Sequence, residues 1–179
     1  MHKDIGKILF STRAIQKRIR KLGAEIRSDY NGKNPMMIAV LKGSFIFMAD
    51  LVRAMEMDCQ IEFLGVASYG NRSETSGAVR LTKDLTCDIE GRHVLVVEDI
   101  LDSGLTLNYL MGYLKNRQPA SIEICTLLDK PERRKVPVHA RYKGFQVPNN
   151  FVVGYGLDHA ENYRNLPYIG VLKEGVAVE

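Results

Sequence analysis

Three carboxylates lie close together near the middle of the sequence, at Glu98, Asp99 and Asp102. They end an apolar run, and residues typical of a phosphate-binding turn follow at once: Ser103, Gly104, Leu105 and Thr106. Successive amides and hydroxyls at the start of a helix bind phosphate, and glycine lets the backbone approach it. Glu98 and Asp99 would repel a phosphate, and they suit sugar hydroxyls or a hydrated Mg²⁺ instead. The segment therefore predicts a phosphate site next to an acidic cluster at a strand end, with Asp102 between the two and placed to accept a proton.

The alternative interpretation is that all three acids merely cap the following helix and are solvated. Three acids at one strand end are costly unless a cation or a proton donor offsets them, which disfavours this interpretation.

The elements that position this segment are predicted from apolar patterning. Apolar residues at Ile15, Ile19, Leu22 and Ile26 after an N-cap at Ser11 predict a helix. Two more helices are predicted over 45–55 and 106–116. Consecutive apolar runs predict buried strands over 36–41, 61–67, 93–98, 122–128 and 151–154, with a short sixth over 168–172. This alternation indicates an α/β fold with a parallel sheet, in which ligands bind beyond the carboxyl ends of the strands.

Polar or glycine-containing segments follow five of the predicted strands, as expected for such a site. In chain order they are Lys42-Gly43-Ser44, Ser68-Tyr69, the acidic segment, Asp129-Lys130-Pro131 and Gly156-Leu157-Asp158. A long polar stretch over about 69–85 lacks a periodic apolar face, and we interpret it as an active-site lid. The charge run Glu132-Arg133-Arg134-Lys135 is interpreted as a solvated surface.

Composition limits the class of protein. The 179 residues suit a single domain, and 45% hydrophobic with 26% charged residues is ordinary for a globular chain. A net charge of +4 permits an anionic ligand without requiring nucleic acid. No apolar run is long enough to cross a membrane, and no signal sequence is evident. The scattered cysteines, Cys59, Cys87 and Cys125, are interpreted as reduced residues of a cytoplasmic protein.

The central segment closely resembles the phosphoribosyl diphosphate (PRPP) signature of the type I phosphoribosyltransferases. Glu98-Asp99 followed by Asp102 is similar to the 6-oxopurine branch, the hypoxanthine-guanine phosphoribosyltransferases. Further resemblances cover nearly the whole chain: Leu41-Lys42-Gly43-Ser44, Ser68-Tyr69, Leu128-Asp129-Lys130-Pro131, the stretch 151–158 and the stretch 161–167.

The resemblance implies a type I phosphoribosyltransferase fold. Residues 1–179 would form one domain, with a parallel-sheet core flanked by helices, a flexible lid loop and a small hood from the N-terminal residues and about 150–179. It implies Mg²⁺-dependent transfer of the phosphoribosyl group from PRPP to N9 of hypoxanthine or guanine, giving IMP or GMP and pyrophosphate. Relatives form dimers or tetramers, so a homodimer or homotetramer without nucleic-acid or membrane partners is expected.

The resemblance also assigns roles to residues. Asp102 would handle the N7 proton of the purine as catalytic group. PRPP binding would fall to Glu98, Asp99, Asp102, Ser103, Gly104, Leu105 and Thr106. Pyrophosphate would be held by Lys42, Gly43 and Arg164, with a Lys42–Gly43 peptide bond that can be cis. The lid would begin at Ser68 and Tyr69. The purine would meet Lys130, Phe151, Val152 and Asp158, and the metal would be held by Glu98, Asp99 and Asp158.

Other interpretations remain open at this point. From the residues alone, Lys42 and Lys130 read as surface lysines. A nucleotide-sensing regulator on the same fold could bind RNA or DNA, although the chain has no room for an added binding module. A xanthine-preferring transferase would need a different pocket around purine C2, which the sequence does not resolve.

Overall fold

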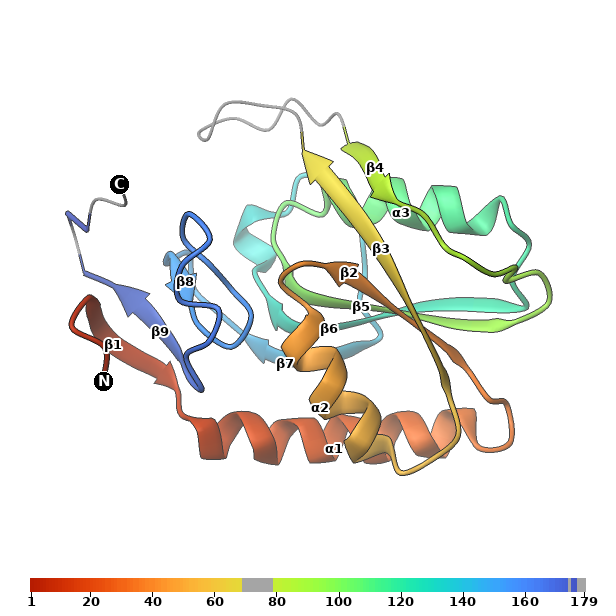
Figure 1. Ribbon diagram of the computed structural model, residues 1–179, viewed down its shortest axis with the longest axis horizontal. Helices are drawn as coiled ribbons and strands as arrows, with labels where there is room; N and C mark the ends of the chain where they lie inside the picture. Colours follow the sequence, from red (N-terminus) through yellow and green to blue (C-terminus); the bar gives the residue numbers. More distant parts are fainter. Residues whose placement is uncertain (69–78, 174, 177–179) are drawn as a thin grey trace.

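The computed structural model describes residues 1–68, 79–173 and 175–176 (Figure 1). Its helices are α1 (Thr12–Tyr30), α2 (Phe45–Met55) and α3 (Leu105–Lys115), with a short 3₁₀ turn η1 (Pro131–Arg133). Its strands are β1 (Ile5–Phe10), β2 (Met36–Leu41), β3 (Gln60–Ser68), β4 (Val79–Lys83), β5 (His93–Leu101), β6 (Ser121–Asp129), β7 (Tyr142–Gln146), β8 (Val152–Val153) and β9 (Ile169–Leu172).

The main sheet has the strand order β4-β3-β2-β5-β6-β7. Strands β3, β2, β5, β6 and β7 run parallel, and β4 pairs antiparallel with β3. The chain moves outward in one direction from β2 to β3 and in the other from β5 to β6. Beyond the carboxyl ends of β2 and β5 the order reverses, which is where open α/β sheets form their ligand crevice.

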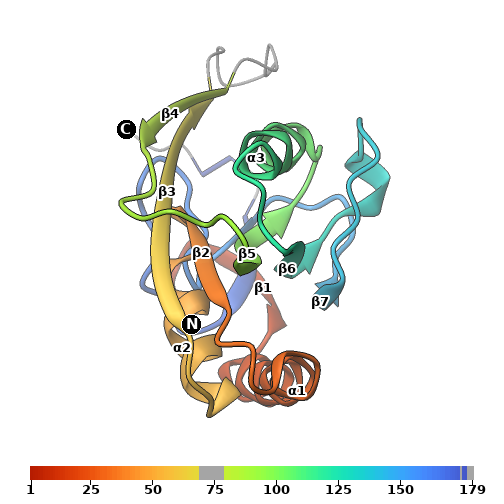
Figure 2. The same ribbon diagram turned by 90° about the vertical axis from the view of Figure 1, so that its right-hand side faces the viewer.

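Helices cover both faces of the main sheet, as Figure 2 shows with α3 on one side and α1 with α2 on the other. One core cluster packs α1 and α2 against Met37, Ala39 and Leu95, and the other packs α3 against Ile38 and Val96. Adjacent residues of β2 and β5 therefore enter opposite clusters, as the period of a strand requires. The prediction of strands buried on both faces is confirmed.

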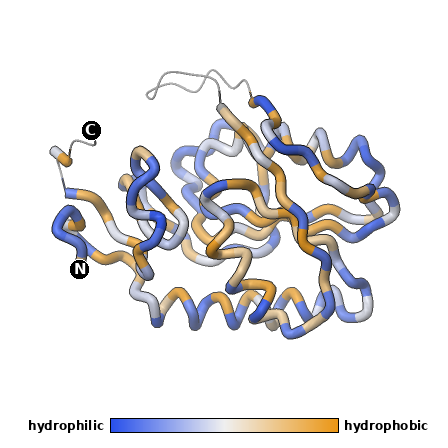
Figure 3. The backbone as a smooth tube through the Cα atoms, viewed as in Figure 1, coloured by the Kyte–Doolittle hydropathy of each residue, from blue (hydrophilic) through white to orange (hydrophobic). Residues whose placement is uncertain are grey.

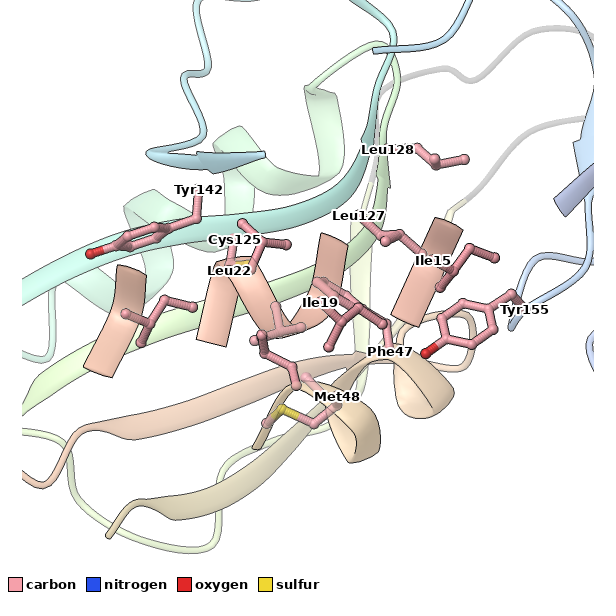
Figure 4. Close-up of a cluster of buried hydrophobic side chains, with 14 of the residues drawn as sticks. Ile15, Ile19, Leu22, Phe47, Met48, Cys125, Leu127, Leu128, Tyr142 and Tyr155 are labelled. Carbon is pink, nitrogen blue, oxygen red and sulfur yellow. The ribbon is translucent and has the colours of Figure 1, made fainter. Parts of the chain in front are cut away.

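Helix α1 shows how the pattern of the sequence fixes one of these layers. Ser11 accepts a hydrogen bond from the Ala14 amide at 3.3 Å, so the predicted N-cap is confirmed. Ile15, Ile19 and Leu22 are at most 1% exposed and pack beside Phe47 and Leu127, as the close-up in Figure 4 shows. Figure 3 shows the same division along the chain, with hydrophobic strands and a helix that alternates between hydrophobic and polar residues.

A second sheet stands beside the main sheet in Figure 1 and joins the two ends of the chain. Its strands β1, β9 and β8 are all antiparallel. Val152 and Ile169 from this sheet belong to the same core cluster as α1 and α2, so the small sheet is packed onto the main one. This sheet corresponds to the hood expected from the resemblance, and the mixed α/β architecture is confirmed.

One strand predicted from patterning lies in another sheet, and two strands were missed. Patterning alone made 151–154 a fifth strand of the parallel sheet, whereas β8 lies in the small antiparallel sheet, within the hood that the resemblance implied. The outer strand of the parallel sheet is β7, which the sequence analysis missed because Tyr142-Lys-Gly-Phe-Gln146 lacks an apolar run. Strand β1 was missed for the same reason, since Ile5-Gly-Lys-Ile-Leu-Phe10 carries exposed residues between its apolar ones.

The described part of the stretch expected as a lid, about 69–85, contains strand β4. Strands β3 and β4 pair antiparallel, with Ser68 opposite Val79, and residues 69–78 of the expected lid lie outside the described residues. Glu62 of β3 is 7% exposed and accepts bonds from the Thr86 hydroxyl, the Thr86 amide and Lys83. The hydroxyl bond is the main cause that lowers the pKa of Glu62 to about 2. This carboxylate fixes β3 to the end of β4.

No helix in the described part of the chain is both long and apolar enough to cross a membrane. Cys125 is buried, Cys87 is exposed and Cys59 lies between these extremes, and all three are free thiols.

Candidate active site

The reversal of strand order brings together two loops that are far apart in the sequence. The loop after β2 carries Lys42 and Gly43, and the loop after β5 begins at Asp102. A pocket of about 200 Å³ lies between them, lined among others by Gly43, Glu98, Asp102, Ser103, Gly104 and Thr106. Complete small-molecule sites hold roughly 300–1,000 Å³, so this pocket accommodates one part of a larger ligand.

The acidic pair lies inside β5 rather than after it, because the strand continues to Leu101. Asp99 is 8% exposed, and its carboxylate fills the space beside Gly43 where a Cβ would stand. Glu98 lines the pocket, and its buried Oε2 has no hydrogen-bond partner among the described residues. Burial, followed by the neighbouring Asp99 charge, holds the pKa of Glu98 well above its ordinary value, and burial raises the pKa of Asp99. Burial thus disfavours the charged form of both carboxyls, and a bound cation or hydroxyl donors would offset this cost.

The turn between β5 and α3 is built to bind an anion. Gly104 has φ +83°, a left-handed conformation that glycine adopts readily, and it takes the N-cap position of α3. No side chain of the described residues caps the helix there. The Leu105 amide makes only a long bond of 3.4 Å to the Ser103 hydroxyl. The first amides of α3 are therefore open toward the pocket that Ser103 and Thr106 line.

Asp102 and Lys130 directly follow the paired ends of the neighbouring strands β5 and β6. Lys130 is 5% exposed, and its ammonium group makes no hydrogen bond within the described residues. Burial lowers the pKa of Lys130, and the nearby Asp102 charge partly opposes this effect. The Asp102 Oδ1 atom lies 3.2 Å from Arg133 Nε. A largely buried lysine whose ammonium group makes no hydrogen bond with the described residues points to a ligand that supplies an acceptor.

Arg134 joins the two strand ends that carry Asp102 and Lys130. Its guanidinium group donates to the Asp102 carbonyl at 3.0 Å, to the Val138 carbonyl at 2.7 Å and to the Asp129 carboxylate. Its side chain is 17% exposed, so the expectation of a fully solvated charge run over 132–135 is wrong at this position. The sequence gives no sign of it, because Arg133 and Arg134 are identical neighbours and only the fold buries one of them.

The loop after β2 carries a cis peptide bond, one residue earlier than expected. The resemblance implied that Lys42–Gly43 can be cis, whereas the structure has the cis bond at Leu41–Lys42. Gly43 is packed from two sides, since a Cβ there would overlap Asp99 and the Gly43 carbonyl occupies the Cβ position of Gly156. Gly156 has φ +101°, so it suits this close approach on both counts. The loop is thus held between β5 and the small sheet.

Four charged groups form a network where this loop meets the loop after β8. Arg164 donates to the Gly156 carbonyl at 2.8 Å and pairs with Asp158 Oδ1 at 3.0 Å. Its Nε atom is buried and has no partner among the described residues. Glu161 accepts from Lys42 at 3.0 Å and lies 3.5 Å from Arg164. The Lys42 contact is the main cause that lowers the pKa of Glu161.

The remaining predicted residues fall at the margin of this region. Val152 is buried in β8, while Phe151 is 56% exposed and packs edge-on against His159 at a ring distance of 5.1 Å. Ser68 is the last residue of β3. Tyr69 lies outside the described residues. The structure therefore brings the acidic segment, Lys130, the loop after β2 and Arg164 to one end of the sheet, and leaves Phe151 exposed beside them.

Sequence reasoning assigned no role to Glu161, Arg134 or Gly156. Glu161 is three residues before Arg164, and this spacing is the one sequence feature that pairs them. Nothing in the sequence relates Glu161 to Lys42, which lies 119 residues away.

No group of three or more metal-ligating side chains gathers within the parts of the chain that the structure describes. Mg²⁺ usually keeps several water ligands and uses one or two carboxylates together with substrate phosphates. The unpartnered Glu98 Oε2 and the adjacent Asp99 fit this mode of binding.

Comparisons with known proteins agree with this geometry. Residues 6–160 match the model of the phosphoribosyl transferase domain. The hypoxanthine-guanine phosphoribosyltransferase of Bacillus subtilis is 52% identical over 176 residues, covering 98% of both chains. A crystal structure of a hypoxanthine phosphoribosyltransferase from Staphylococcus aureus superposes with a TM-score of 0.96 at 45% identity, covering 100% of this chain and 97% of that one.

A third similarity concerns longer proteins. The bifunctional protein TilS/HprT of Listeria monocytogenes is 51% identical over all 179 residues, but the chain spans 28% of the length of that relative. The near full-length matches and the domain model both point to one family. The chain belongs to the hypoxanthine-guanine phosphoribosyltransferases, within the phosphoribosyl transferase domain family.

Proposed function

We propose that this chain transfers the 5-phosphoribosyl group of PRPP to N9 of hypoxanthine or guanine, forming IMP or GMP and releasing pyrophosphate. N9 of the base attacks the anomeric carbon, the bond from that carbon to pyrophosphate breaks, and the purine loses a proton. The observation that carries this proposal is the pocket at the strand reversal, where an uncapped helix start faces a buried carboxylate without a partner. These groups match a phosphate and a ribose within one ligand.

The roles within PRPP follow from the charges of the two loops. The open amides from residues 102–106, with the Ser103 and Thr106 hydroxyls, hold the 5′-phosphate. Glu98 and Asp99 hold the ribose hydroxyls, since both carboxyls can accept or share protons there. Lys42, the Gly43 amide and the free Nε of Arg164 hold the pyrophosphate and stabilise the charge that develops on it as it leaves.

The purine lies on the opposite side of Asp102, between Lys130 and the small sheet. Lys130 donates to O6, which fits a largely buried lysine whose ammonium group makes no hydrogen bond with the described residues and selects an oxo over an amino group. Asp102 takes or holds the N7 proton. Phe151 stacks near the base, and the backbone of Val152 meets its exocyclic edge.

Mg²⁺ is the proposed metal, held through water by Glu98 and Asp99 and, on the pyrophosphate side, by Asp158. When bound it would neutralise charge on the pyrophosphate leaving group. The lid begins at Ser68 and Tyr69, and closing it would keep water from the electrophilic carbon. We also propose that residues 1–179 act as one domain, because both sheets share one core cluster. A cytoplasmic location and a homodimer or homotetramer stay predictions.

The experiment that tests the function is pyrophosphate release from PRPP with Mg²⁺, offering hypoxanthine, guanine, xanthine and adenine separately, with a control without base. We expect fast release with hypoxanthine or guanine and none with adenine. Binding of PRPP without release for any base would favour a nucleotide-sensing regulator on this fold. Fast release with xanthine alone would favour a xanthine-preferring transferase.

The role of Lys130 has a separate test in Lys130→Ala. We expect the KM for hypoxanthine to rise at least roughly tenfold, because one charge-assisted hydrogen bond is removed. The KM for PRPP should change little. A change confined to PRPP in steady-state kinetics would assign Lys130 to the other substrate.

A further inference from the structure

The Glu161 carboxylate forms ion pairs with Lys42 and Arg164, the two side chains that the proposed function assigns to pyrophosphate. Its Oε2 atom lies 3.0 Å from Lys42 Nζ and 3.5 Å from an Arg164 nitrogen. Lys42 belongs to the loop after β2 and Arg164 to the loop after β8, so the carboxylate bridges the two sides of the site. We propose that Glu161 is an internal competitor of pyrophosphate, and this inference rests on the proposed function of Lys42 and Arg164.

The Glu161 side chain can leave this position because its carboxylate contacts no described residue other than Lys42 and Arg164. Its side chain is 65% exposed, and the side chain of its partner Lys42 is 67% exposed. Its backbone, by contrast, is fixed, since its amide donates to Asp158 Oδ2 at 2.8 Å and its φ is +64°. Rotation about side-chain bonds therefore moves the carboxylate away without moving the loop.

Arg164 does not depend on Glu161 for its position. Its side chain is 19% exposed and is held by the Gly156 carbonyl and Asp158, at 2.8 Å and 3.0 Å. Its buried Nε has no partner among the described residues. Loss of Glu161 would therefore leave the arginine in place and remove only a negative charge from the site.

The competition works in both directions of the reaction. When PRPP binds, its pyrophosphate part replaces the carboxylate on Lys42 and Arg164. After transfer, the returning carboxylate displaces pyrophosphate, so Glu161 speeds release at the expense of affinity. Exposed ion pairs are weak, which makes this exchange reversible. An ordinary structural salt bridge predicts the opposite sign, because its removal would loosen the site and weaken binding.

The test is isothermal titration of Mg²⁺-pyrophosphate into the wild type and into Glu161→Gln, at constant ionic strength. We expect Glu161→Gln to bind roughly 3- to 5-fold more tightly, since one weak competing ion pair is removed. The matched control is Glu90→Gln, which removes the same charge from an exposed residue whose carboxylate makes no ion pair with the described residues. We expect it to match the wild type within about twofold.

Equal or weaker binding by Glu161→Gln would overturn the inference while leaving the proposed function intact. A wild type that binds PRPP but does not bind Mg²⁺-pyrophosphate would overturn both the inference and the proposed roles of Lys42 and Arg164. Product inhibition provides a second measurement, in which the inhibition constant of pyrophosphate against PRPP should fall by the same factor. Glu161→Ala should give the same sign, so the result does not depend on the glutamine side chain.

Discussion

The acidic strand end and the charge network around Glu161 serve the same site, but the fold holds them differently. Residues 98–106 are contiguous, and their key groups are buried or tied to buried partners such as Arg134. The network of Lys42, Asp158, Glu161 and Arg164 joins two loops over more than a hundred residues, and its lysine and glutamate are mostly exposed.

Because of this difference, substitutions in the two regions should affect stability and function differently. A change at the strand end disturbs buried charges and buried carbonyl groups, which are costly to leave without partners. A change in the exposed network removes weak ion pairs that water replaces. We therefore expect variants of the first region to lose stability together with activity. Variants of the second region should change pyrophosphate binding, weaker for Lys42 and tighter for Glu161, with little change in stability.

The largest effect is expected for Arg134→Ala. The change leaves Asp129 buried with one remaining cation, Lys143, and removes the donor to the Asp102 and Val138 carbonyls. The free energy of unfolding should fall by about 3–5 kcal/mol, as for other broken buried pairs. Urea denaturation measures it.

Arg133→Ala is the matched neighbour for this experiment. Arg133 is 51% exposed and makes one ion pair with Asp102, so its loss should cost less than about 1 kcal/mol of unfolding free energy. Equal losses for the two arginines would mean that Arg134 is not the buried link between the strand ends.

Asp102→Ala is expected to lower turnover by about 10²-fold or more, the usual scale for an acid–base group. The measurement is the initial rate of pyrophosphate release with hypoxanthine at saturating PRPP. Asp58→Ala, an exposed carboxylate in the loop before β3, should keep the wild-type rate. Near-normal turnover of Asp102→Ala would remove Asp102 from the catalytic role.

The fold could be predicted where a local sequence pattern defines the element. The runs Met36–Leu41 and Phe45–Met55 were placed at their observed bounds, since each combines an uninterrupted pattern with turn residues at its ends. Strand β7 could not be found, because Gly144 and the polar residues around it hide a strand that only its neighbour β6 defines. Patterning alone placed residues 151–154 in the wrong sheet, since strand propensity says nothing about strand partners, and only the resemblance put them in the hood.

The same limit applies to the site. The segment 98–106 was visible because its groups are consecutive, whereas the contact between Lys42 and Glu161 exists only after the small sheet packs onto the large one. Which of two adjacent arginines is buried is likewise decided by tertiary packing, at the turn η1 that precedes Arg134.

Gly43→Ala tests a point where the two regions touch. An added Cβ would overlap the Asp99 carboxylate, so the loop after β2 must shift, and overpacking of this kind costs about 1–3 kcal/mol. The Tm for thermal unfolding should fall, and the KM for PRPP should rise. Gly112→Ala in α3 is the control, because nothing lies within 4 Å of its added Cβ and a helical alanine stabilises by about 0.5–1 kcal/mol. A wild-type KM for Gly43→Ala would show that the loop position is not needed for PRPP.

The smallest effect on stability is expected for Lys42→Ala, and this variant separates the two regions most directly. Its ion pair with Glu161 is exposed on both sides, so the free energy of unfolding should change by less than about 1 kcal/mol. Pyrophosphate binding should nevertheless weaken roughly tenfold, because a charge-assisted hydrogen bond is lost. Urea denaturation and calorimetric titration on the same preparation give both values. A large loss of stability would show that the exposed network holds the two sheets together, and the contrast between the regions would then fail.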